Sequence, residues 1–152
     1  MTQHITRTVV SGRRALTAVE AALHHAGDVR ITVVVVDRAG VLVAACRHED
    51  ALPATSDLAL AKARAAAGFA KPAEALAGVV QPGAPYFGLP AAVAAPIATF
   101  AGGLPLLDDG YCFGAVGVSG GTGEQDADIA RVAVSAYLDQ AQPSADPAHS
   151  NE

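Results

Sequence analysis

The feature that most constrains this chain is a strand-forming run followed at once by a turn and a second run. Residues 31–36 read Ile-Thr-Val-Val-Val-Val, the turn Asp37-Arg38-Ala39-Gly40 follows, and a second apolar run covers residues 41–46. β-Branched residues favour strands, and a short turn that ends in glycine is typical of a hairpin. The pattern therefore predicts two paired antiparallel strands in the first third of the chain.

A second hairpin is predicted near the end of the chain. The turn signal Asp108-Asp109-Gly110 separates the apolar residues 102–107 from the strand-like residues 111–118. Strands joined by hairpins pair antiparallel, which favours an α+β fold over a parallel, doubly wound sheet.

Three segments carry apolar residues at helical spacing and predict amphipathic helices. Gly27 ends the first, either Thr55 or Ser56 caps the start of the second, and Thr122 with Gln125 forms a capping-box pattern for the third. Residues 73–76 suggest a short further helix, and the proline-rich residues 78–96 are expected to be loop-like. The expected apolar faces are Leu16, Val19, Leu23 and Ala26 in the first helix, Leu58, Ala66 and Phe69 in the second, and Ile129, Val132, Ala133, Ala136 and Tyr137 in the third.

Composition indicates one folded domain that associates with itself. The chain has 152 residues, of which 51% are hydrophobic and 16% charged, so residues 1–141 suffice for a single core. The polar residues 142–152 are expected to form a disordered tail. Because the apolar content exceeds what a small core can bury, we expect a homodimer or a larger homo-oligomer.

Charge and hydropathy exclude two classes of partner. The formal net charge is −5 and no basic run is present, so nucleic acid is not an expected partner. Every apolar run is shorter than the roughly 18 residues that a membrane span requires, and the first residues lack an apolar signal region. We therefore expect a soluble, cytoplasmic protein without a membrane partner. Cys46 and Cys112 match no disulfide or zinc pattern and are expected to be buried or half-buried.

Lys62 is the most unusual candidate site residue. It shares the covered side of the second helix with Leu58 and Ala66, so it needs either an acid partner or a pocket mouth. Asp126 and Asp50 are the acids expected within reach. Two interpretations of Lys62 stay open: it forms an ion pair that holds the helix against the sheet, or it is a functional lysine.

The glycine-rich segment around Ser119 offers two further readings. Gly117-Val118-Ser119-Gly120-Gly121 matches the nucleophile elbow of serine hydrolases, but the only later histidine is His149 in the tail, so a catalytic triad is not expected. The free N–H groups at Ser119–Gly123 could hold an anion. The first-turn acids Glu124 and Asp126 favour a helix that caps itself instead.

His48 is the candidate metal ligand among the histidines. It follows a strand end within the polar cluster Arg47-His48-Glu49-Asp50. It is either a solvated turn residue or a ligand to haem iron or another metal.

Several motifs together resemble one known family. They are Val34–Gly40, Asp50-Ala51, Lys62-Ala63, Phe87-Gly88-Leu89, Gly102–Leu106, Gly114–Gly120 and Glu124–Asp126. In this order they resemble the GlcG/HbpS family, also called DUF336 or haem-degrading proteins, over roughly residues 8 to 140. The resemblance implies a profilin-like α+β fold with an antiparallel sheet flanked by helices, assembled into dimers or larger oligomers. Some members bind haem, and a related domain occurs in cobalamin adenosyltransferases. This chain has Arg47-His48-Glu49-Asp50-Ala51 where many relatives have Arg-Met-Asp-Gly-Ala.

The leading hypothesis is a small oligomeric protein that binds haem or another planar hydrophobic ligand in a crevice. Phe69, Tyr86 and Phe87 would form its wall, Arg47 or Lys62 would pair with carboxylates, and His48 would ligate iron. Ser119 is a further candidate binding residue.

The alternative is a small-molecule enzyme in which Lys62, with Glu124 and Asp126, performs proton transfer or Schiff-base chemistry. A non-catalytic interaction module is a third hypothesis.

Overall fold

The computed structural model describes residues 8–139 and contains a four-stranded antiparallel sheet with the strand order β2-β1-β4-β3. The strands are β1 Thr32–Asp37, β2 Leu42–Arg47, β3 Gly103–Asp108 and β4 Tyr111–Ser119, and the helices are α1 Gly12–Ala26, α2 Ala54–Phe69, the 3₁₀ helix η1 Ala73–Val79, α3 Leu89–Ala92 and α4 Gly123–Leu138. Both predicted hairpins and the α+β class are confirmed. The predicted tail, residues 142–152, lies outside the described residues.

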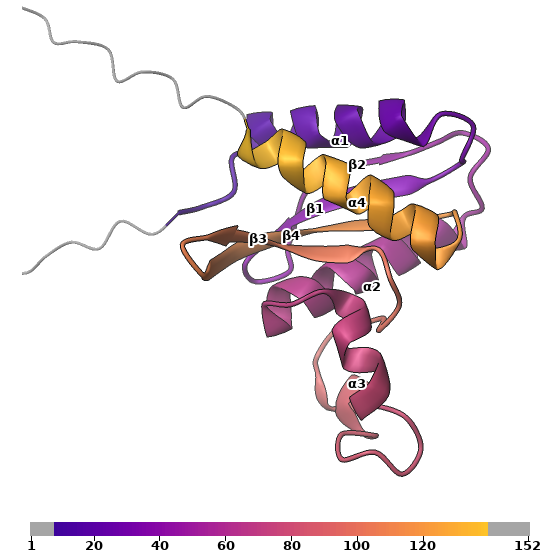
Figure 1. The fold of residues 1–152 in the computed structure, drawn as a ribbon, viewed down its shortest axis with the longest axis vertical. Helices are drawn as coiled ribbons and strands as arrows, with labels where there is room; N and C mark the ends of the chain where they lie inside the picture. Colours follow the sequence, from indigo (N-terminus) through magenta and orange to yellow (C-terminus); the bar gives the residue numbers. More distant parts are fainter. Residues whose placement is uncertain (1–7, 140–152) are drawn as a thin grey trace, which may run out of the picture.

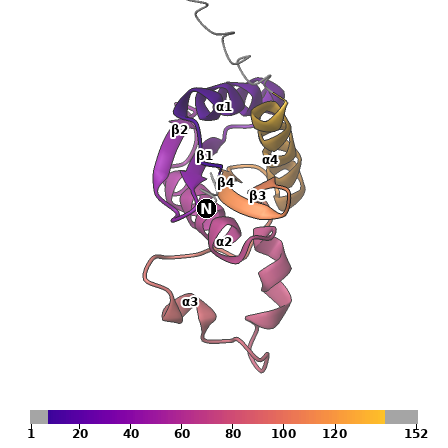
Figure 2. The same ribbon diagram turned by 90° about the vertical axis from the view of Figure 1, so that its left-hand side faces the viewer.

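Helices cover both faces of the sheet. α1 and α4 pack side by side on one face and α2 packs on the other (Figure 1, Figure 2). The connection between α2 and β3, residues 70–102, contains η1 and α3 and extends beyond α2, and we call it the arm. β4 is central and is buried from Cys112 to Ser119 because helices lie on both sides of it. This explains why its sequence is apolar at nearly every position rather than at alternate ones.

The helices contact the sheet through alanines rather than through the predicted leucines. Leu16 is 57% exposed and Leu58 is 38% exposed, so the expected apolar faces of α1 and α2 were wrong at these two positions. The residues that meet the sheet are instead mostly small: Ala15, Ala18, Val19, Ala22 and Ala26 in α1, and Ala59, Ala63, Ala66 and Ala67 in α2.

Glycines of the sheet explain why α2 uses alanines. A Cβ atom on Gly117 would lie 2.0 Å from the carbonyl oxygen of Ala59, and one on Gly103 would lie 2.4 Å from that of Lys62. The backbone of α2 therefore rests directly on β3 and β4, and no large side chain fits between them.

The predicted N-terminal cap is confirmed for α4 but not for α2. Thr122 and Gln125 form the predicted capping box of α4. The prediction that Thr55 or Ser56 caps α2 was wrong, since α2 starts after Pro53 without a side-chain cap. Thr55 lies inside the helix, where its Oγ1 donates to the carbonyl of Leu52 and lies 2.8 Å from Oγ1 of Thr32.

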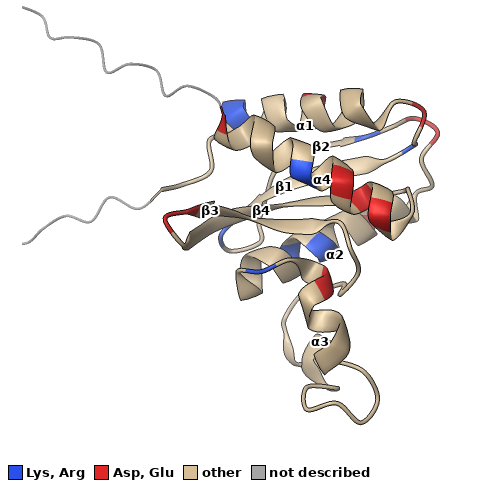
Figure 3. Ribbon diagram, viewed as in Figure 1, with Lys and Arg blue, Asp and Glu red and all other residues tan. Residues whose placement is uncertain are grey.

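The arm carries an uncharged surface beyond its base. No charged residue occurs between Glu74 and Asp108, and the arm is accordingly tan beyond its base in Figure 3.

The two cysteines differ in their exposure. Cys46 on the edge strand β2 is exposed, which corrects the expectation that it is buried or half-buried, whereas Cys112 is buried.

Within residues 8–139, none of the helices is both long and apolar enough to cross a membrane.

Candidate functional site

The buried polar side chains gather at one end of the sheet. The polar residues that are buried in the described part of the chain are Thr32, Thr55, Lys62, Ser119 and Asp126. They come from the start of β1, from α2, from the end of β4 and from the first turn of α4. Thr32 is paired with Ser119 across β1 and β4, so the two strands bring this cluster under the first half of α2.

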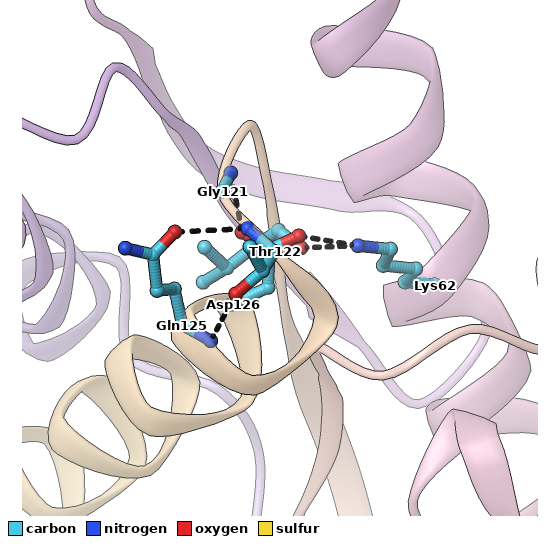
Figure 4. Close-up of polar contacts among 6 residues, drawn as sticks. Lys62, Gly121, Thr122, Gln125 and Asp126 are labelled. Carbon is cyan, nitrogen blue, oxygen red and sulfur yellow. Dashed lines mark hydrogen bonds and ion pairs between the residues drawn. The ribbon is translucent and has the colours of Figure 1, made fainter.

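A buried ion pair lies at the centre of this cluster (Figure 4). Lys62 Nζ donates to Asp126 Oδ2 at 2.9 Å and to the carbonyl oxygen of Val118 at 2.9 Å, while Asp126 Oδ1 accepts from the Gly121 N–H at 2.8 Å. The two charged side chains are only 5% and 3% exposed. The pair thus joins α2, the end of β4 and α4 at one point.

Glycines enclose the ion pair. A Cβ on Gly102, whose φ is +118°, would lie 2.5 Å from the Val118 carbonyl oxygen and 3.2 Å from Lys62 Nζ. A Cβ on Gly121 would lie 2.9 Å from Gln125 and 3.1 Å from Asp126 Oδ1. The glycine-rich motifs at 102–103 and 117–121 therefore allow close packing around the pair, and four surface cavities described for this chain are lined by neither Lys62 nor Asp126.

Two amides of the glycine-rich turn already have side-chain partners. The Gly121 N–H bonds Asp126, and the Thr122 N–H donates to Gln125 Oε1 at 2.9 Å. Of the two readings left open for this turn, the geometry supports the self-capped helix. Ser119 is buried, and within residues 8–139 no hydrogen bond joins it to a histidine. Glu124 is exposed on the first turn of α4 and is not in the ion pair.

A groove opens at the other end of α2. It consists of two adjoining cavities of about 550 and 280 Å³ that share Arg38, Ala39 and Gly68. We call their union the α2 groove. The larger cavity is completed by Ala67, Ala70, Gly110, Tyr111 and Cys112, and the smaller by Gly40, Arg64, Phe69, Val93, Ala94, Ala95 and Ile97.

Two arginines from separate elements line the groove. Arg38 belongs to the β1–β2 turn, and its Cζ lies 5.1 Å from the centre of the Tyr111 ring. Arg64 belongs to α2, and its Nε donates to the Gly40 carbonyl oxygen at 3.3 Å. Burial raises the pKa of the Cys112 thiol, although the Gly114 backbone and Arg38 act in the opposite direction. The thiol in the groove is therefore protonated at neutral pH.

The structure does not bring the proposed haem residues together. Only Phe69 lines the α2 groove. Arg47 donates to the Ala51 carbonyl oxygen at 2.9 Å beyond the end of β2, and Tyr86 and Phe87 are each 61% exposed on the arm.

His48 also lies outside the groove. Its side chain is 32% exposed, and its Nδ1 accepts the Asp50 N–H at 3.1 Å. That bond favours the neutral tautomer with the proton on Nε2, so ligation of iron through Nε2 requires a tautomer change. Residues 8–139 contain no cluster of three or more histidine, cysteine, aspartate or glutamate side chains that could hold a metal ion.

Sequence reasoning missed Arg38, Arg64 and Gly68. A signal was present, because Arg64 and Gly68 are four residues apart on an alanine-rich helix and hence share one face. Nothing in the sequence, however, places the 38–41 turn beside that face.

Comparisons with known proteins agree on one group. Residues 10–135 match the family model described as "Haem degrading protein HbpS-like". The corrinoid adenosyltransferase PduO of Salmonella typhimurium is 41% identical over 118 residues, which are 76% of this chain but 35% of that protein. The chain thus spans about a third of the length of this relative.

Two solved structures are similar to the chain in both fold and amino-acid sequence. The Klebsiella pneumoniae protein ORFY, assigned to DUF336, has a TM-score of 0.86 and 30% identity, covering 93% of this chain and 99% of its own. A complex of PduOC with haem has a TM-score of 0.79 and 37% identity, covering 85% of this chain and 95% of its own.

Proposed function

This chain belongs to the HbpS-like family of haem-degrading proteins, and we propose that it is a small ligand-binding protein that takes haem, or a molecule of similar planar and apolar character, into the α2 groove. The observation that carries this proposal is the groove itself. It is an open concavity that combines apolar side chains, most of them in the smaller cavity, with the polar side chains of Arg38, Arg64 and Tyr111, and a concave site of this mixed character is typical of small-molecule binding. The haem complex of PduOC supports haem as the first ligand to test.

The geometry favours binding over catalysis by Lys62. A Schiff-base or general-base lysine must reach the substrate, whereas Lys62 is 4% exposed and is bonded to Asp126 and to the Val118 carbonyl. Glu124, its proposed partner, is exposed elsewhere on the turn. We infer that Lys62 and Asp126 hold α2 against α4, and that the enzymatic alternative has less support.

We also propose that the protein forms a homo-oligomer. Large apolar side chains are exposed on α1, at the start of the edge strand β2 and just before it, and on the arm: Leu16 at 57%, Leu42 at 52%, Val41 at 58%, Tyr86 and Phe87 at 61%. Exposed apolar area of this kind is usually covered by a partner. Sedimentation velocity of the purified chain tests this, and a monomer at micromolar concentration would contradict it.

Filling the groove should weaken haemin binding strongly without unfolding the protein. Gly68 lines both cavities, and nothing lies within 4 Å of the position of its Cβ. Gly68→Leu therefore places a side chain in the groove, and it also removes a helix-destabilising glycine from α2. In a titration followed at the Soret band, wild-type protein should saturate, while Gly68→Leu should weaken binding by about a hundredfold, as expected when a contact worth about 2.7 kcal/mol is lost.

Gly78→Leu is the matched control. Gly78 lies in η1, also has nothing within 4 Å of its Cβ position, and does not line the α2 groove. This variant should bind haemin as the wild type does. Equal binding by Gly68→Leu and wild type, or a flat wild-type titration, would contradict the proposed function.

His48, the iron ligand suggested by the sequence, lies at the opposite end of β1 from the α2 groove. Its N–H donates to the Ile31 carbonyl oxygen just before β1, whereas Arg38 of the groove follows the end of β1. Haem bound in the groove is therefore not expected to be ligated by His48 of the same chain, and His48→Ala should leave the Soret maximum of the ferric complex unchanged, as should the control His24→Ala on the exposed side of α1. A Soret maximum that moves in His48→Ala alone would show the loss of an axial ligand and would contradict the groove as the haem site.

A further inference from the structure

The α2 groove contains two cationic groups that are not neutralised by any carboxylate of the described residues. Among residues 8–139, neither Arg38 nor Arg64 forms an ion pair with a carboxylate. The nearest acid in sequence, Asp37, uses its Oδ1 to accept the N–H groups of Ala39 and Val41. The two guanidinium groups thus face the groove without an internal counter-charge.

Both arginines contact neighbouring groups of the protein. The Cγ of Arg64 lies 3.1 Å from the Cβ position of Gly40, and its Nε bonds the Gly40 carbonyl oxygen. Arg38 lies over the face of Tyr111. A guanidinium has five N–H donors, so most of those on each arginine remain available to a ligand. Side chains that are already ordered lose less conformational entropy when a ligand binds.

The remaining wall of the smaller cavity is uncharged. Phe69, Val93 and Ile97 supply apolar surface beside the two arginines. The whole chain carries a net charge of −5, so this pair of cations is a local feature and not part of a generally basic surface. An apolar wall flanked by two unpaired guanidinium groups is complementary to an apolar ligand that carries acid groups.

We propose that the α2 groove selects ligands with two carboxylates, and that Arg38 and Arg64 each bind one of them. This inference rests on the proposed function for its site and adds the ligand class. It replaces Arg47 and Lys62, which the sequence suggested for this purpose, because Arg47 lies outside the groove and Lys62 is bonded to Asp126.

Paired ligands that differ only in their acid groups test the proposal. Protoporphyrin IX is compared with its dimethyl ester by fluorescence titration, and 4,4′-biphenyldicarboxylate is compared with 4-phenylbenzoate by calorimetry. Since each charge-assisted hydrogen bond contributes at least about tenfold, the wild type should bind 4,4′-biphenyldicarboxylate about tenfold more tightly than 4-phenylbenzoate, and protoporphyrin IX about a hundredfold more tightly than its dimethyl ester. Arg38→Met and Arg64→Met should each reduce both preferences by about tenfold and leave the affinity for the ester nearly unchanged.

Arg47→Met is the matched control, because Arg47 is exposed and does not line the groove. It should keep the full preference for diacids, and the melting temperature of each variant reports that it is folded. A diacid preference that is absent from the wild type in both pairs, or that is undiminished in both groove variants, overturns the inference. Binding of the biphenyl diacid through both arginines without any porphyrin binding would overturn haem as the ligand but support this assignment.

Discussion

Asp126→Asn should cost about 3–5 kcal/mol of unfolding free energy, although the substitution hardly changes the size of the side chain. Asp126 balances the charge of Lys62 inside the protein, where both side chains are almost fully buried. In the Asp126→Asn variant, the side-chain oxygen that accepts the Gly121 N–H is retained, but an amide nitrogen replaces the oxygen 2.9 Å from Lys62 Nζ. The amide NH₂ group and the Lys62 ammonium group can both only donate hydrogen bonds, so they then face each other without an acceptor, and the buried charge of Lys62 has no counter-charge.

Urea unfolding measures this cost, and a double variant identifies its cause. Lys62→Met/Asp126→Asn removes the charge and the donor conflict together, so it should recover most of the stability lost in Asp126→Asn. Glu124→Gln on the same turn is the control for a change in surface charge, because Glu124 is exposed and should change stability by no more than about 0.5 kcal/mol. A double variant as unstable as Asp126→Asn would show that the ion pair is not the source of the loss.

Gly117→Ala should destabilise the protein by at least about 3 kcal/mol, at the upper end of the cost of overpacking. The added Cβ would lie 2.0 Å from the Ala59 carbonyl oxygen and 2.9 Å from the backbone nitrogen of Ala63. Because these are backbone atoms of α2, a change of rotamer cannot relieve the contact, and the whole helix must move away from the sheet. Such a movement also separates Lys62 from the Val118 carbonyl.

Gly78→Ala is the control for Gly117→Ala, since a Cβ at Gly78 meets no atom within 4 Å. It should leave the midpoint of urea unfolding nearly unchanged. If Gly117→Ala is also within about 1 kcal/mol of the wild type, the close contact between α2 and β4 is not essential, in contrast to our interpretation of the glycine motif. That interpretation assigns Gly117 and Ser119 to packing rather than to a serine-hydrolase elbow.

The sequence alone was sufficient to predict the sheet and its flanking helices. Hairpin turns and β-branched runs are local signals, so strands were predicted at residues 31–36, 41–46, 102–107 and 111–118 without knowledge of what they contact, and each observed strand begins and ends within one residue of the prediction. The Thr122–Gln125 capping box was equally local, because both partners lie within one turn. The sequence also predicted that Lys62 is covered and needs either an acid partner or a pocket mouth, with Asp126 and Asp50 as the acids in reach. The tertiary structure selects Asp126.

Which leucines are buried and where a ligand can bind were decided by tertiary structure. Leu58 and Ala59 are neighbours on one helix, and only the close approach of α2 to Gly117 makes the small residue the buried one. The α2 groove depends on the placement of the β1–β2 turn and residues 93–97 beside α2, so that Arg38 and Arg64 meet across elements far apart in the chain. Periodicity and capping describe neighbours along the backbone, whereas a groove is the space left between elements after they pack, and that space has no local sequence signal.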